Sequence, residues 1–308
     1  MVKLEDIERL VVQAGFDLFG VTRAEYLPVG ESRFRHWLER GYGDDLAYLH
    51  RNLEVRFDAS KLLDGGRSVI VCAMNYKSLF SSGEKRCDDG VQIASYALMR
   101  DYHKTIRRQL KEIMKGLQQL YPTIKGRMFT DSAPLLEKAL AVNAGLGWIG
   151  RQSLLITPQF GSFVLLGEIL IDDDVDCYSV SMAESGCGKC SRCVDRCPAQ
   201  AINVDRTIDA RRCIACRTIE VEDDREDSFA GWIFGCDICQ RVCPHNQKTP
   251  YATFESVLPT LQPPTADEWL SMDEEKFRTL TQGTPMSRTS LERIKRSVSI
   301  NRRDSQTH

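Results

Sequence analysis

The chain has almost no net charge and no long hydrophobic run. Its 41 lysines and arginines nearly balance 43 aspartates and glutamates, which leaves a formal charge of −2 over 308 residues. This balance excludes a uniformly basic nucleic-acid-binding protein but still permits a local basic face. The longest apolar stretch, residues 163–171, is interrupted by Glu168 and is too short to cross a bilayer. The first residues are acidic and amphipathic, unlike a signal peptide, so we expect a cytoplasmic protein without membrane contact.

The regular elements expected from the pattern are those of an α/β or α+β domain. Residues 68–76 and 162–171 are rich in β-branched and apolar side chains and predict strands. Helical periodicity covers four ranges, 2–14, 32–40, 98–120 and 134–144. The glycines of Gly145-Leu-Gly147-Trp-Ile-Gly150 lack a preceding strand and a βαβ frame, so they do not predict a dinucleotide loop.

Composition divides the chain into three parts. We predict an N-terminal domain over residues 1–175, a cysteine-rich module over 176–250 and a short helical, basic C-terminal segment over 251–308. Thr265-Ala-Asp-Glu268 has the pattern of a capping box and indicates a helix start in the last part.

Nine of the twelve cysteines lie between Cys187 and Cys243, and eight of them fall into two spaced sets. The first four have the spacing Cys-x2-Cys-x2-Cys-x3-Cys-Pro, which is typical of thiolates that bind a [4Fe–4S] cluster and whose fourth cysteine ligates a second cluster. A split set follows, with one cysteine alone and then Cys-x2-Cys-x3-Cys-Pro. We therefore predict one cluster on Cys187, Cys190, Cys193 and Cys243, and another on Cys197, Cys213, Cys236 and Cys239.

Two alternatives accompany this prediction. Cys216 lies near Cys213 and could replace it as a ligand. Zinc also binds CxxC pairs, but its sites use two separated pairs per ion, so triplets followed by Cys-Pro favour iron. The remaining cysteines follow no ligand spacing and are expected to be free thiols: Cys72, Cys87 and Cys177.

Motifs along residues 4–250 resemble the epoxyqueuosine reductases, which complete queuosine in tRNA with the help of cobalamin. The resemblance rests on these segments: Arg56, Ala73-Met-Asn-Tyr76, Arg100-Asp-Tyr-His-Lys104, Asp131-Ser-Ala-Pro134, Ala144-Gly-Leu-Gly-Trp-Ile-Gly150, Gly161-Ser162, Leu166-Gly-Glu-Ile169 and Gly235-Cys-Asp-Ile-Cys239. It implies a cobalamin-binding N-terminal domain joined to a ferredoxin-like domain with two clusters, which reduces an epoxide in the anticodon loop.

The resemblance also implies roles for single residues. Asp131 is expected to contact the cofactor and to give a proton to the departing epoxide oxygen, which a partly desolvated carboxyl could hold near neutral pH. A competing interpretation makes Asp131 the N-cap of the helix that follows. The residues expected to bind the corrinoid are, besides Asp131, Arg56, Arg151, Ser153, Leu155, Leu166 and Asp237. For Arg56, an ordinary surface position is the alternative.

His103 follows Asp101 as in a cobalt-ligating signature, but the glycine of that signature is missing. We therefore expect His103 to be structural or to belong to the substrate pocket. The chain leaves room for only a few helices after the cysteine module, and its Cys243-Pro-His-Asn246 departs from the family's usual tryptophan. These departures affect how tRNA is held. Candidate phosphate-binding residues are Arg107, Arg108, Arg211, Arg212, Arg288, Arg293, Lys295, Arg296, Arg302 and Arg303.

The predicted function is reduction of epoxyqueuosine in tRNA by a monomer that takes electrons from an external low-potential donor. A reductive dehalogenase is a second possibility, although such enzymes usually carry an export signal and protonate with a tyrosine. A ferredoxin-like electron carrier is a third. It would leave the large N-terminal domain without a purpose.

Overall fold

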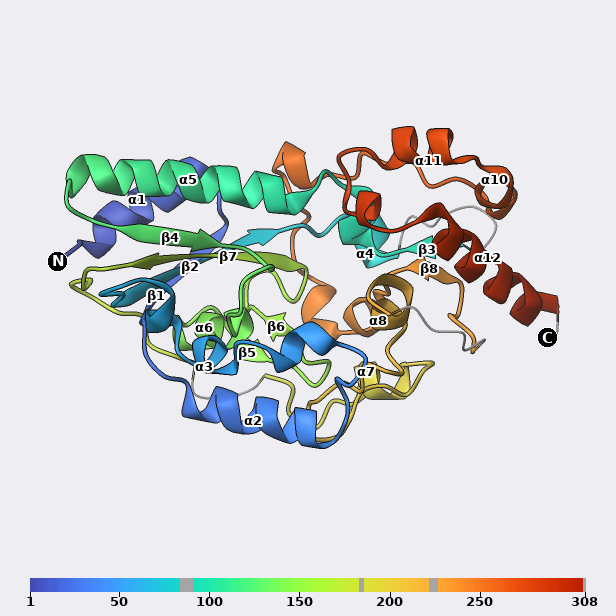
Figure 1. Cartoon of the computed structure of the whole chain (residues 1–308), viewed down its shortest axis with the longest axis horizontal. Coiled ribbons are helices and arrows are strands. Elements are labelled where there is room, and N and C mark those ends of the chain that lie inside the picture. Colours follow the sequence, from blue (N-terminus) through green and yellow to red (C-terminus); the bar gives the residue numbers. More distant parts are fainter. Residues whose placement is uncertain (84–90, 183–185, 222–226, 307–308) are drawn as a thin grey trace.

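An antiparallel sheet forms the centre of the N-terminal half in the computed structural model, which describes residues 1–83, 91–182, 186–221 and 227–306 (Figure 1). The strand order is β1-β2-β7-β4. Central β2 (Ser68–Asn75) and β7 (Val164–Ile171) confirm the two predicted strands, and every residue of β2 is buried. The edge strands β1 (Leu18–Arg23) and β4 (Gly126–Phe129) were not predicted, because each is short and lacks a run of β-branched residues.

Helices cover both faces of this sheet (Figure 1). On one face α1 (Leu4–Ala14) and α5 (Tyr102–Leu120) pack on alternate residues of β2, such as Ile70 and Cys72. On the other, α6 (Glu137–Asn143) packs on the intervening ones, Val69 and Val71. This alternation is the period of two that a strand buried on both faces requires.

The four predicted helices are confirmed as α1, α2 (Pro28–Glu39), α5 and α6. A short additional helix, α3 (Leu53–Phe57), was not predicted. Helix α5 begins later than expected because Ser95–Leu98 forms a separate 3₁₀ turn. Asp101 then caps α5 by accepting a hydrogen bond from the backbone N–H of His103.

The glycine-rich segment forms a hairpin and not a dinucleotide loop. Strand β5 (Trp148–Ile149) lies within this segment and pairs antiparallel with β6 (Leu155–Ile156). A Cβ on Gly147 would lie 2.0 Å from the carbonyl oxygen of Ile156, so only glycine allows the two strands to approach this closely.

The cysteine-rich module is built from short elements: α7 (Arg192–Asp195), α8 (Ile214–Ile219), β8 (Trp232–Phe234) and α9 (Ile238–Arg241). Strand β8 pairs in parallel with β3 (Gln92–Ile93), which follows α4 (Leu79–Ser82). Residues 79–83 and 91–98 thus pack against the module although they fall within the predicted first domain. The three domain limits remain a prediction.

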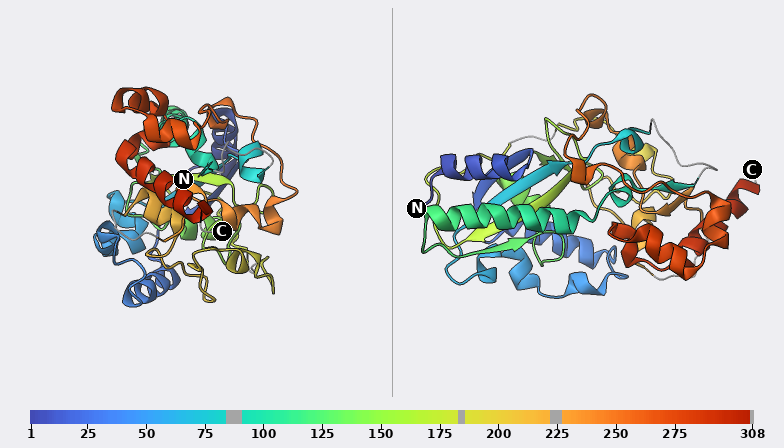
Figure 2. Two further views of the ribbon diagram at one scale, coloured as in Figure 1. Left: turned by 90° about the vertical axis from the view of Figure 1, so that its right-hand side faces the viewer. Right: turned by 90° about the horizontal axis from the view of Figure 1, so that it is seen from above.

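The C-terminal segment folds onto the same region. Helices α10 (Ala266–Ser271), α11 (Glu274–Thr281) and α12 (Leu291–Gln306) lie at the end of the molecule opposite the N-terminus (Figures 1 and 2). Their apolar side chains, including Trp269 and Ile294, share a core with Leu98 and Phe234. The predicted capping box is confirmed at Thr265 and Glu268. Among the described helices, none is long and apolar enough to cross a membrane.

A buried polar junction joins the cysteine-rich module to the sheet. Asn246 accepts a hydrogen bond from the backbone N–H of Ser162 at 2.7 Å and donates to Ser162 Oγ at 2.9 Å. Gln240 donates to the Ser162 carbonyl at 2.9 Å, and Lys77 donates to the Asn246 carbonyl at 2.7 Å. The preceding Gly161 has a φ of +64°, and a Cβ there would lie 2.0 Å from Asn246 Oδ1.

Gly161→Ala should therefore destabilise the protein severely. The left-handed backbone costs a residue with a side chain about 1–2 kcal/mol, and displacing Asn246 breaks the junction in addition. Gly283→Ala is the matched control, because Gly283 has a φ of +76° but no atom within 4 Å of its added Cβ. Denaturant unfolding of the cluster-loaded proteins should show a clearly larger loss for Gly161→Ala. Equal losses would mean that the junction contributes nothing beyond backbone strain.

Candidate functional site

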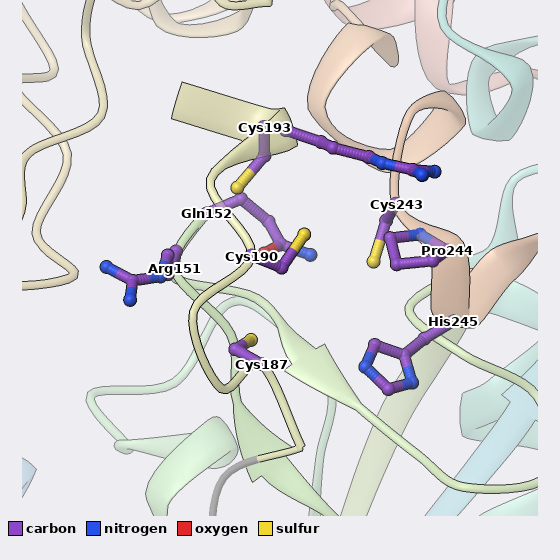
Figure 3. Close-up of a pocket in the computed structure, with 9 residues that line it drawn as sticks. Arg151, Gln152, Cys187, Cys190, Cys193, Cys243, Pro244 and His245 are labelled. Atoms are coloured by element: carbon purple, nitrogen blue, oxygen red, sulfur yellow. The ribbon is translucent and has the colours of Figure 1, made fainter. Parts of the chain in front are cut away.

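Four cysteines of the first predicted set line one pocket. Cys187, Cys190, Cys193 and Cys243 surround it together with Arg151, Gln152, Arg192, Pro244 and His245 (Figure 3). Cys187 and Cys190 lie on the loop that leads into α7, Cys193 lies in α7 itself, and Cys243 follows α9. The structure thus brings the distant Cys-Pro cysteine to the first triplet, as the ferredoxin pattern requires.

The four cysteines of the second predicted set, Cys197, Cys213, Cys236 and Cys239, are all half-buried. Burial raises the pKa of Cys236, and the nearby thiols of Cys213 and Cys197 raise it further. Burial likewise raises the pKa of Cys239, with Cys236 and Cys213 adding to the effect. These mutual influences show that the thiols of the second predicted set lie near one another. The backbone N–H of Ala201 points at Cys197 Sγ over 3.4 Å, an interaction that tunes the potential of a cluster.

The Cys216 side chain packs beside Leu46, Ala210 and Val221 in a separate apolar cluster. Its backbone N–H, by contrast, donates a hydrogen bond to the Cys213 thiol. The arrangement favours Cys213 over Cys216 as the ligand.

The cysteines do not converge as zinc ligands would. Within the described residues, no group of three or more His, Cys, Asp or Glu side chains closes on the position of a single metal ion. A zinc ion needs its ligands within about 2.3 Å, whereas a cubane holds its four thiolates at separate corners. The donor set therefore fits [4Fe–4S] clusters better than zinc. Of the other cysteines, Cys72 is buried and Cys177 is exposed, and Cys87 lies outside the described residues.

Asp131 stands in the loop between β4 and α6. Its backbone has a φ of +60°, a conformation that aspartate tolerates better than most residues. Helix α6 begins at Glu137 with Leu136 as its N-cap, so the interpretation of Asp131 as the cap is wrong. Instead, the Asp131 backbone N–H donates to Glu137 Oε1 at 2.6 Å, which holds the loop and leaves the Asp131 carboxyl free to point elsewhere.

The Asp131 carboxyl meets the start of α5. Its Oδ2 lies 2.8 Å from His103 Nε2 and accepts a hydrogen bond from Tyr102 Oη at 3.3 Å. The side chain is 57% exposed, and the His103 contact holds its pKa below the usual range. Our expectation that desolvation keeps this carboxyl protonated is therefore wrong for the molecule as it stands, because the hydrogen bond outweighs the burial.

His103 connects Asp131 to two further groups. Its Nδ1 lies 2.8 Å from Asp101 Oδ1, and its Nε2 lies 3.1 Å from Arg288 Nη1. Arg288 also approaches Asp101 Oδ2 at 3.5 Å. The sequence suggested Arg288 only as a phosphate ligand; the structure puts it in this cluster. No local signal could have revealed this contact, because 185 residues separate Arg288 from His103.

Arg56 is buried in α3 and is not the surface arginine of our alternative. Its guanidinium lies 5.4 Å from the centre of the Phe34 ring, burial lowers its pKa, and its Nε has no hydrogen-bond partner. Near the first set of cysteines, Trp148 Nε1, Arg151 Nε and Gln152 Nε2 are also buried without partners. Buried donors are rarely left unsatisfied, so these atoms indicate a missing polar ligand.

The other predicted cofactor residues lie in several places. Leu155 is buried in β6, and Ser153 lies in the hairpin turn with a φ of +60° and a carbonyl that accepts from Lys138. Leu166 is half-buried in β7. Asp237 is buried and accepts a hydrogen bond from the Ser95 backbone at 2.8 Å, so it fastens the cysteine module to the 3₁₀ turn and contacts none of the Asp131 cluster in the described contacts.

A buried carboxyl pair lies behind Asp131. Burial raises the pKa of Glu168 on β7, and the charge of Glu137 raises it further. Among the described residues, the hydrogen-bond partner of the Glu168 carboxyl is the Glu137 carboxyl alone. Burial and the charge of Asp131 raise the pKa of Glu137 to about 7. The pair therefore holds a proton at neutral pH, since two adjacent buried carboxylates would repel each other.

Comparison with known proteins identifies relatives over nearly the whole chain. Residues 56–132 match a family model described as epoxyqueuosine reductase QueG, DUF1730, and residues 186–246 match a 4Fe-4S double cluster binding domain. The epoxyqueuosine reductase of Cyclobacterium marinum is 36% identical, covering 95% of this chain and 94% of the relative. That of Escherichia coli is also 36% identical, covering 96% of this chain and 79% of the relative.

Solved structures show the same α/β fold. Epoxyqueuosine reductase from Streptococcus thermophilus aligns with a TM-score of 0.84 and 24% identity, over 96% of this chain and 80% of that one. A crystal structure of an epoxyqueuosine reductase with an epoxyqueuosine-modified tRNA stem loop aligns with the same score, the same coverage and 23% identity. The match to the double-cluster domain confirms the prediction of two iron–sulfur clusters, while the individual ligands remain predictions.

Replacement of Cys213 and Cys216 distinguishes the two candidate ligands. Cys213→Ser should lose up to half of the iron and sulfide, because one cubane loses a thiolate. Cys216→Ser, only three residues away, should retain both clusters. Iron and sulfide analysis of anaerobically purified protein, with EPR after reduction, measures the difference. The opposite pattern would assign the ligand to Cys216.

Glu168→Gln should stabilise the protein at high pH. The folded state keeps the Glu168 proton to a higher pH than the unfolded chain does, so this residue costs stability as pH rises above the ordinary pKa of a glutamate. The amide removes that cost, and we expect a gain of about 1 kcal/mol or more at pH 8, shrinking toward pH 5. Urea unfolding at both pH values measures it, with exposed Glu39→Gln as the control. A gain that does not depend on pH would contradict the assignment.

Proposed function

We propose, from the premise that the chain belongs to the epoxyqueuosine reductase family, that it reduces epoxyqueuosine to queuosine in the anticodon loop of tRNA. The observation that carries the proposal is the position of Asp131. The chain holds this carboxyl at an open surface, backed by a histidine, in the same fold that contains a double-cluster module. A simple electron carrier has no need for such an acid.

The residues present fit both kinds of cofactor. Two sets of four cysteines suit two [4Fe–4S] clusters, on the ligands predicted above. Arg56, Trp148, Arg151 and Gln152 each have a buried N–H group without a partner among the described residues. These donors suit the amide arms and phosphate of cobalamin. Arg56, Arg151, Ser153, Leu155, Leu166 and Asp237 would hold this corrinoid together with Asp131. When bound, cobalamin supplies a cobalt centre that can store two electrons delivered singly by the clusters.

Asp131 supplies the acid that the reaction needs. Conversion of the epoxide to an alkene takes two electrons and two protons and releases the oxygen as water. An alkoxide is a poor leaving group, so a proton must reach the oxygen as its C–O bond breaks. The Asp131 carboxyl is exposed and can deliver this proton. Its pKa is held low by His103, so the proton has to be available from the neighbouring group.

Basic residues of α5 adjoin this acid and would bind the tRNA backbone. Arg107 donates to Ser132 Oγ at 2.9 Å, directly beside Asp131, and Lys104 and Arg108 are exposed on the same helix. Two other candidates form ion pairs within the protein, Arg211 with Asp209 and Arg302 with Asp267. A base of an anticodon loop is already unstacked, so it can reach an exposed acid at low cost.

Electrons would reach the protein at the first set of cysteines. Cys187 and Cys190 are half-buried, and the exposed cations Lys189, Arg192 and Arg196 surround them. This rim suits an acidic, low-potential electron-transfer protein, because complementary charges speed the encounter of redox partners. We expect the enzyme to act as a monomer in the cytoplasm, where its tRNA substrate is found and its thiols stay reduced.

Asp131→Asn should lower the rate of epoxyqueuosine reduction by about 10²–10⁴-fold while iron content and corrinoid binding stay unchanged. The substrate is tRNA from cells that lack the activity, incubated with reconstituted protein, cobalamin and a low-potential reductant. Nucleoside mass analysis then follows the loss of one oxygen. Asp195→Asn, an exposed carboxylate on α7, is the control. Wild-type protein that binds no corrinoid and leaves the tRNA unchanged would instead indicate an electron carrier, and full activity of Asp131→Asn would remove Asp131 from the acid role.

A further inference from the structure

A buried chain of charged groups runs from Asp131 into the protein. His103 lies between two carboxylates, with Asp101 on its Nδ1 side and Asp131 on its Nε2 side, each at 2.8 Å. Its side chain is only 6% exposed, and that of Asp101 is 10% exposed. The Tyr102 ring stacks on the imidazole with ring centres 3.9 Å apart. The charged or titratable groups that the described contacts place against His103 are therefore Asp101, Tyr102, Asp131 and Arg288.

Two of these contacts exclude each other. When Nε2 carries a proton, it donates to Asp131 and cannot accept from Arg288. When Nε2 is bare, it can accept from Arg288 Nη1, which lies 3.1 Å away. In both cases Asp101 accepts a hydrogen bond from the Nδ1–H of His103, which fixes the orientation of the ring and its tautomer. The cluster therefore has two hydrogen-bonded states that differ by one proton at Nε2, and neither state leaves this nitrogen without a partner.

We propose that His103 is the proton store that reloads Asp131, and that Arg288 from the C-terminal segment occupies Nε2 after the proton has left. This inference rests on the proposed function. A proton moves from Nε2 to Asp131 Oδ2, and from there to the epoxide oxygen as its C–O bond breaks. His103 becomes neutral and retains its Nδ1 proton on Asp101. Solvent then returns a proton to the imidazole, and a second passage along the same path completes the water. The two electrons come from the external donor through the clusters.

The position of Arg288 is fixed by the fold. The Asp101 backbone N–H donates to the Gly283 carbonyl at 2.7 Å, which ties the start of α5 to the C-terminal segment. Thr284, Pro285 and Met286 are buried between this contact and Arg288. The guanidinium also neutralises the second carboxylate of the cluster, since it approaches Asp101 Oδ2. With His103 charged, two carboxylates face two cations, so the buried imidazolium is balanced.

The experiment compares Asp101→Asn, His103→Gln, Arg288→Gln and Arg288→Lys in the full-length, cluster-loaded protein. Nitrogen NMR of ¹⁵N-histidine-labelled protein reports which ring nitrogen of His103 carries the proton, with His103→Gln identifying its signals. We expect a proton on Nδ1 at high pH in the wild type. Asp101→Asn should move it to Nε2, because the asparagine amide can donate to Nδ1.

Single-turnover reduction of tRNA-bound epoxyqueuosine provides the second readout. The wild-type rate should depend on pH, because the reacting proton passes through His103 Nε2. His103→Gln should lower the maximum rate by about 10²-fold or more and change the shape of the pH profile, with tRNA affinity unchanged. In a separate multiple-turnover assay, Arg288→Gln should slow the reaction, and Arg288→Lys should restore part of the rate. Arg278→Gln, an exposed cation on α11, is the control.

The outcomes separate this inference from the proposed function. If wild-type protein leaves epoxyqueuosine intact, the proposed function fails, and the inference fails with it even if the NMR tautomers behave as expected. If the wild type is active but His103→Gln keeps both its rate and its pH profile, the proton store is refuted alone. An unchanged His103 tautomer in Asp101→Asn would likewise refute it.

Discussion

The hydrogen-bonded junction at Asn246 is the constraint on which the relative position of the two halves depends. One amide satisfies the backbone and hydroxyl of Ser162 and also donates to the Gln240 carbonyl. Because all of these groups are buried, each unmade bond would leave a desolvated polar atom at a cost of about 1–3 kcal/mol. The junction therefore permits little sliding. Cys243 lies only three residues before Asn246, so the cysteine predicted to close the first cluster is held near the start of β7.

A second constraint concerns Asp131, the proposed acid. Asp131 follows an edge strand, adopts a left-handed backbone and is anchored through its N–H by Glu137. None of these contacts uses the carboxyl, which is left to His103 and Tyr102. An acid at an open surface cannot rely on desolvation to keep a proton, and its pKa is in fact lowered. The surrounding cluster has to compensate, which explains why a histidine with a fixed tautomer stands directly behind it.

Much of this architecture follows from local patterns. The buried strands β2 and β7 and the amphipathic helices α1 and α5 have periodicities that only one packing satisfies, and the Cys-Pro spacing anticipates that Cys243 joins the first triplet. The features that escaped prediction are long-range. Helix α6 starts six residues after Asp131, because Glu137 binds the Asp131 N–H from within the helix. The burial of Arg56 depends on Phe34, and the contact of Arg288 with His103 depends on the C-terminal segment folding back onto α5.

In the proposed mechanism, electrons and protons reach the substrate by separate routes. The cysteines lie on loops of residues 187–243, whereas the proton-bearing groups come from the start of α5, the loop after β4 and the C-terminal segment. The C-terminal segment acquires a chemical role from this division. This segment places Arg288 beside His103 Nε2 and Asp101 Oδ2. The guanidinium thereby balances the negative charge of the carboxylates along the proposed proton route.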